Sequence, residues 1–106
     1  IGSLTEDQTL NDIAQGYADR MAKFGFISHT APDGQTFQDR LKVAGLTTGE
    51  YGENLSFATK FELALQGLEN SPSHRKNILS SAWKKVGIGL AYNVKGEVYI
   101  VQVFGK

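Results

Sequence analysis

The apolar residues of this 106-residue chain repeat at spacings of three and four in some segments and of two in others. Spacings of three and four predict amphipathic helices, and alternation predicts strands. We expect the first helix to start at Thr9 or Asn11 and to end near Phe24, after a polar lead-in from Leu4 to Gln8. Its apolar stripe is formed by Leu10, Ile13, Ala14, Tyr17, Ala18 and Met21.

The middle of the chain predicts two short helices around a strand. Residues Pro32-Asp33-Gly34 fit a turn, and Thr36 to Ala44 fits a short helix with Gly45 as the glycine that follows its end. Residues Glu53 to Ala58 alternate as a strand does, with Glu53, Leu55 and Phe57 on one face. A further helix is expected from about Lys60 to Glu69, where helical spacing returns.

A third short helix is expected to follow directly. Ser71 is a suitable N-cap, and Pro72 suits the first helical position. His74 then falls in the first turn, where the positive end of the helix dipole favours a neutral imidazole. We expect this helix to end near Ser80. From this pattern alone, the favoured interpretation is a histidine that only caps the helix or packs locally.

The last quarter of the chain predicts a β-hairpin. Residues 86–92 and 97–104 form its strands, and 93–96 form its turn. The second strand is apolar on both faces, so layers should cover both sides of the sheet. Gly87, Gly89 and Ala91 leave one face nearly bare, which favours either a close helix or a groove. The elements together predict one domain over residues 1–106, an α/β three-layer α-β-α sandwich with a central antiparallel sheet.

Composition narrows the classes of function. Eleven Lys and Arg residues balance eleven Asp and Glu residues, so the net charge gives no argument for nucleic acid or for an anionic membrane. The absence of cysteine excludes thiol chemistry, disulfides and thiolate metal sites but leaves the compartment open. No apolar run is long enough to span a bilayer. The chain begins without the pattern of a signal peptide, and a leader or anchor removed before residue 1 is compatible with it.

Before any resemblance to a family is considered, the sequence offers three residues that could carry chemistry. The chain has two histidines, His29 and His74, and Glu53 shares a strand face with apolar residues. A buried carboxylate needs a partner, so Glu53 should lie at a rim or be paired. Two histidines and a glutamate form some catalytic zinc sites. However, the three lie far apart, and neither a His-Glu-x-x-His nor a Gly-x-Ser-x-Gly motif is present.

Six short motifs occur in a particular order along the chain. They are His29-Thr30-Ala31-Pro32-Asp33-Gly34, Phe37-Gln38-Asp39-Arg40-Leu41, Gly52-Glu53-Asn54-Leu55, Asn70-Ser71-Pro72-Ser73-His74-Arg75-Lys76-Asn77-Ile78-Leu79, Val86-Gly87-Ile88-Gly89 and Gln102-Val103-Phe104-Gly105. In this order the chain resembles the cysteine-free bacterial branch of the CAP superfamily, also called the SCP domain. The resemblance runs from about Leu10 to Gly105.

The resemblance implies an α-β-α sandwich with a cleft that holds two histidines and acidic residues. His29, Glu53 and His74 match the cleft positions directly. The family's second glutamate lies three residues after a tryptophan, but Leu68 stands at the tryptophan position here, and Glu69 is out of register. Glu53 either lines the cleft or holds a loop through backbone hydrogen bonds. Gln102 is expected to be hydrogen-bonded in the core, with the cleft as its alternative place.

The function implied is that of a monomeric bacterial binding module, secreted or exposed at the cell surface. Its cleft would bind a divalent metal, zinc above all, through His29 and His74, with Glu53 as third ligand or as an orienting group behind them. A small lipid or a protein is the other partner implied. The alternatives are a metal-assisted hydrolase with Glu53 as general base, or a structural or partner-binding module in which the histidines play no part.

Overall fold

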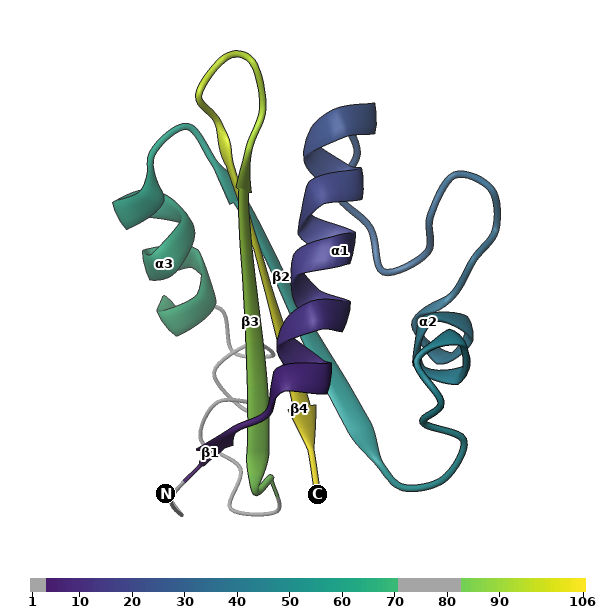
Figure 1. The fold of residues 1–106 in the computed structure, drawn as a ribbon. Coiled ribbons are helices and arrows are strands. Elements are labelled where there is room, and N and C mark those ends of the chain that lie inside the picture. The colour runs from purple at the N-terminus through teal and green to yellow at the C-terminus, as the bar shows by residue number, and fades with distance from the viewer. Residues whose placement is uncertain (1–3, 71–82) are drawn as a thin grey trace.

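The computed structural model describes residues 4–70 and 83–106 (Figure 1). Within them the chain forms three helices and four strands. In chain order these are β1 (Thr5–Glu6), α1 (Gln8–Phe24), α2 (Phe37–Val43), β2 (Tyr51–Ala58), α3 (Phe61–Asn70), β3 (Lys85–Tyr92) and β4 (Val98–Gly105). The helix expected at Ser71, which carries His74, lies outside the described residues and stays a prediction.

The four strands form one sheet in the order β1-β3-β4-β2. Strands β2, β3 and β4 pair antiparallel, as predicted, and the hairpin register joins Lys85 to Gly105. The polar lead-in to α1 contains a short strand that the sequence analysis did not predict. In this strand, β1, residues Thr5 and Glu6 pair parallel with Lys85 and Val86 of β3 at the edge of the sheet. This strand is exposed and only two residues long, so its own sequence carries no alternating pattern.

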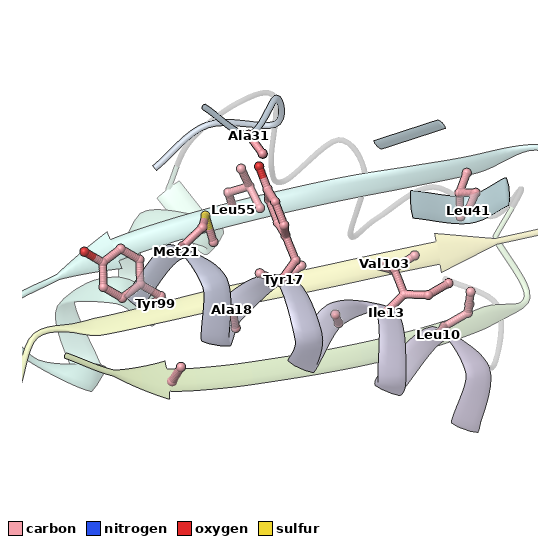
Figure 2. Close-up of a cluster of buried hydrophobic side chains, with 13 residues drawn as sticks. Leu10, Ile13, Tyr17, Ala18, Met21, Ala31, Leu41, Leu55, Tyr99 and Val103 are labelled. Atoms are coloured by element: carbon pink, nitrogen blue, oxygen red, sulfur yellow. The ribbon is translucent and has the colours of Figure 1, made fainter. Parts of the chain in front are cut away.

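Helices cover both faces of the sheet, which confirms the α-β-α sandwich (Figure 1). Helices α1 and α2 lie on one side with the larger apolar core, which includes Tyr17, Met21, Leu41 and Val103 (Figure 2). Helix α3 lies on the other side, where its buried side chains pack against alternate residues of β4. The two apolar faces of β4 are explained by this double cover.

Helix α1 packs directly on the backbone of β3. A Cβ atom at Gly87 would lie 2.1 Å from the carbonyl carbon of Leu10, and one at Gly89 would lie 2.3 Å from that of Ala14. The bare glycine face therefore receives a helix and does not leave a groove. The side chain of Gln15 also bonds both the N–H and the carbonyl of Leu90, at 3.0 and 2.8 Å.

The helix ends are set by side chains near each boundary. Asp7 caps α1 by accepting from the N–H of Leu10 at 2.9 Å, so α1 starts at Gln8, earlier than the predicted Thr9 or Asn11. Thr36 and Asp39 form a reciprocal capping box at the start of α2. Gly45, with a φ of 85°, follows its end as predicted.

Candidate functional site

The candidate site is built around the carboxylate of Glu53. This residue projects from β2 toward the α1 side of the sheet, because its register partner is the core residue Val103. Its side chain is only 1% exposed. A carboxylate this deeply buried must be compensated by donors or by a cation.

Arg40 on α2 supplies that cation. Its Nη2 atom lies 2.7 Å from Oε2 and 3.0 Å from Oε1 of Glu53. Its Nη1 atom donates to the carbonyl of His29 at 3.1 Å. The guanidinium also lies over the ring of Tyr17, 3.3 Å from the ring centroid. Arg40 thus joins α2, β2, α1 and the segment that carries His29.

Tyr17 holds the same segment from the side of α1. Its hydroxyl donates to the carbonyl of Ser28, next to His29 in the chain. Burial raises the pKa of Tyr17 above its usual 10.0, while the charge of Arg40 acts to lower it. The phenol therefore stays protonated at neutral pH and keeps its role as donor.

His29 extends from this buried group toward solvent. Its Nδ1 atom lies 2.8 Å from Oε1 of Glu53, and its side chain is 59% exposed. A carboxylate paired with arginine can only accept a hydrogen bond, so the hydrogen between the two residues belongs to Nδ1 of His29. In a neutral imidazole the free electron pair is then on Nε2. The arrangement presents one oriented nitrogen at the surface.

The described residues include two members of the predicted ligand set, His29 and Glu53. Both oxygens of Glu53 already accept hydrogen bonds from Arg40, and one of them also accepts from His29. No cluster of three or more metal-ligating side chains occurs among residues 4–70 and 83–106. Glu53 therefore fits the orienting role better than the role of a metal ligand. Nε2 of His29 is the ring nitrogen that does not bond Glu53, and His74 lies outside the described residues.

Gln102 is not brought to this group. Its register partner is Asn54, whose side chain lies on the face of the sheet opposite to Glu53. Nδ2 of Asn54 donates to Oε1 of Gln102 at 3.1 Å. Gln102 is hydrogen-bonded to a neighbouring strand, and the structure does not place it in a common site with His29 and Glu53.

A groove of about 490 Å³ lies between α1 and α2. It shares Tyr17 and Arg40 with the site, and its remaining walls include Ile13, Gly16 and Val43. A Cβ atom at Gly16 would meet nothing within 4 Å, so this glycine leaves the groove open along α1.

Arg40 and Tyr17 are the residues that the sequence analysis missed. One signal was available, because Arg40 lies on the same face of its helix as Phe37 and Leu41. An arginine on an apolar helix face and a glutamate on an apolar strand face are each costly alone, which makes them natural partners. No spacing rule joins the two, since they come from different elements.

Comparisons with known proteins agree with this fold. Two curated proteins of Bacillus subtilis (strain 168) are similar in sequence: the uncharacterized protein YkwD, 30% identical over 101 residues, and the uncharacterized membrane protein YlbC, 28% identical over 91 residues. The matches cover 94% and 85% of this chain but only 38% and 26% of the two relatives. The chain therefore spans less than half of either relative. In the described residues no helix is long and apolar enough to cross a membrane.

Solved structures extend the comparison. An extracellular protein with an SCP domain from Bacillus anthracis has a TM-score of 0.86 and 30% identity, and the match covers all of this chain and 34% of that protein. An outer surface protein from Borrelia burgdorferi shares the fold, with a TM-score of 0.87, 24% identity and coverage of 100% and 79% of the two chains. A family model described as CAP, the cysteine-rich secretory protein family, matches residues 1–104. This chain, although it has no cysteine of its own, belongs to the CAP family.

Proposed function

We propose that this chain is a binding domain, exposed at the cell surface or secreted, whose site presents Nε2 of His29 to a divalent metal. The observation that carries the proposal is the 2.8 Å contact between Nδ1 of His29 and Oε1 of Glu53, with Arg40 behind it. A histidine that ligates a metal through one ring nitrogen commonly donates its other N–H to a carboxylate. The surface location is supported by similar proteins described as extracellular and outer surface proteins.

Zinc is the preferred metal of the proposal, because imidazole nitrogen suits zinc well. His29 and His74 would supply the two protein ligands. Glu53 would orient His29 and would not touch the metal. His74 enters from the sequence resemblance alone.

Glu53 is poorly suited to act as a general base. Its side chain is almost fully buried, and its oxygens are held by Arg40 and His29. A general base needs an oxygen within hydrogen-bond reach of the proton that it removes. The binding function is therefore preferred to the metal-assisted hydrolase.

The test is zinc titration by calorimetry on the metal-stripped wild type, His29→Ala, His74→Ala and Glu53→Gln. We expect each histidine variant to abolish saturable binding and Glu53→Gln to weaken it by about 10- to 100-fold, the range typical of an orienting carboxylate. X-ray absorption on the zinc-loaded wild type should find two imidazole nitrogens and no protein carboxylate. Binding that survives in both histidine variants, or a carboxylate ligand in the absorption spectrum, would contradict the proposal.

A small lipid is a second candidate ligand, favoured by the groove between α1 and α2. Its apolar walls, which include Ile13 and Val43, suit a molecule with an apolar body. Replacing Gly16 with phenylalanine should fill the groove and abolish binding of a fluorescent fatty acid, while Gly16→Ala should leave most of the binding intact. Equal fatty-acid binding by wild type and Gly16→Phe would refute this assignment.

A further inference from the structure

One end of the molecule gathers exposed apolar side chains from three separate segments. These segments are the C-terminal end of α1, the turn between β3 and β4 with the end of β3 before it, and the C-terminal end of β2, all at the top of Figure 1. Phe24 on α1 is 64% exposed and Val94 in the turn is fully exposed, at 104%. Phe57 and Tyr92 add two further exposed rings. We call these four residues the apolar tip.

Three of the four tip residues line one hollow, and Tyr92 lines an adjoining hollow with Val94. A hollow of about 480 Å³ is lined by Phe24, Phe57 and Val94 together with Lys23 and Lys95. The ring of Phe57 also packs on Tyr99, with centroids 4.8 Å apart. The exposed apolar atoms therefore belong to one region and are not scattered singly over the surface.

Val94 has no role in holding its own turn. Turns favour glycine, asparagine and other polar residues, and a valine is a poor choice there. The turn is instead fixed by Asn93, whose Oδ1 accepts the N–H groups of Lys95 and Glu97, each at 3.0 Å. An apolar side chain held outward on a fixed turn is already arranged for contact with another apolar phase.

The charges around the tip favour an anionic surface. A lysine adjoins each of the two most exposed apolar residues, since Lys23 precedes Phe24 and Lys95 follows Val94. Neither lysine forms an ion pair within residues 4–70 and 83–106. The nearby acids keep their charge but lie further along the chain from these exposed apolar residues than the two lysines do. Asp19 is one helical turn before Lys23 on α1, and Glu97 is half-buried and accepts from Asn93 at 2.8 Å.

We propose that the apolar tip docks on the surface of an anionic lipid bilayer, with Phe24 and Val94 entering the headgroup region. Exposed aromatic and aliphatic side chains flanked by lysines are the combination that interfacial binding uses, because the apolar atoms leave water while the ammonium groups remain at the headgroups. The contact involves neither His29 nor Glu53 and is independent of the metal site.

The test is co-sedimentation of this chain with vesicles of phosphatidylcholine and phosphatidylglycerol in equal parts, and with vesicles of phosphatidylcholine alone. We expect stronger binding to the anionic vesicles, weakened by added salt. The variant Phe24→Gln/Val94→Asn should bind at least about tenfold more weakly, because it removes the apolar surface that enters the bilayer. Lys23→Gln/Lys95→Gln should lose the preference for anionic vesicles.

Ile88→Asn is the matched control. Ile88 is 53% exposed but lies in β3 four residues before Tyr92, away from the tip. This variant should bind vesicles as the wild type does. The proposal is overturned if the wild type binds neither vesicle, if the tip variant binds as well as the wild type, or if Ile88→Asn weakens binding equally. It is also overturned if the wild type self-associates and the tip variant loses this self-association while its vesicle binding is unchanged.

Discussion

Replacing Arg40 with methionine would leave the carboxylate of Glu53 buried without its cation. Arg40 and Glu53 have side chains that are 7% and 1% exposed, so water cannot take over the lost hydrogen bonds. The substitution removes two bonds to Glu53 and one to the carbonyl of His29. Breaking a buried pair in this way costs about 3–5 kcal/mol. That is a large share of the roughly 5–15 kcal/mol that stabilises a typical domain.

Urea unfolding followed by circular dichroism measures this loss. The double variant Arg40→Met/Glu53→Met removes both charges, so its cost should fall to on the order of 1 kcal/mol. Arg20→Met is the matched control, because Arg20 pairs with Asp33 at the surface, 3.3 Å away, and should cost less than about 1 kcal/mol. The reasoning is refuted if Arg40→Met costs no more than Arg20→Met, or if the double variant is as unstable as the single one.

Two further predictions concern the packing of α1 and the cap of α2. Gly89→Ala should destabilise the fold by at least about 2 kcal/mol in urea unfolding, because its Cβ would meet the backbone of α1. Gly16→Ala, which meets open space, should stabilise by up to about 1 kcal/mol, and the reverse order would contradict the packing. The backbone N–H of Thr36 donates a hydrogen bond to the carboxylate of Asp39, and this bond lowers the pKa of Asp39 below 3.8. A hydrogen bond with the Thr36 side chain lowers this pKa further. The cap therefore contributes its full stability above pH 3.8 and loses it as the pH falls through the lower folded value. Asp39→Asn should remove this acid sensitivity from amide exchange in α2, and an unchanged pH profile would refute the assignment.

Much of the fold could be predicted from local patterns. The six apolar positions of α1 are all buried, as their helical spacing requires. The two apolar faces of β4 correctly indicated cover on both sides of the sheet. These features depend on neighbours within one element, which the sequence records directly.

The candidate site was harder to predict, because it depends on contacts between separate elements of the fold. The sequence indicated that Glu53 needs a partner or a rim position, but only the docking of α2 beside β2 brings Arg40 to it. The face on which Gln102 lies depends on the β2–β4 register, which pairs Glu53 with Val103. Neither strand carries that register in its own pattern. His29 and Glu53, two of the residues that the resemblance named, lie 2.8 Å apart, and their role in a cleft, like that of His74, stays a prediction.

The most direct test of the account is long-range ¹H–¹⁵N NMR of the His29 ring near neutral pH, before and during addition of zinc. The account predicts that the neutral ring carries its hydrogen on Nδ1, toward Glu53, and that zinc shifts the Nε2 resonance of His29. A ring with its hydrogen on Nε2, or an Nε2 resonance that zinc leaves unchanged, would contradict it.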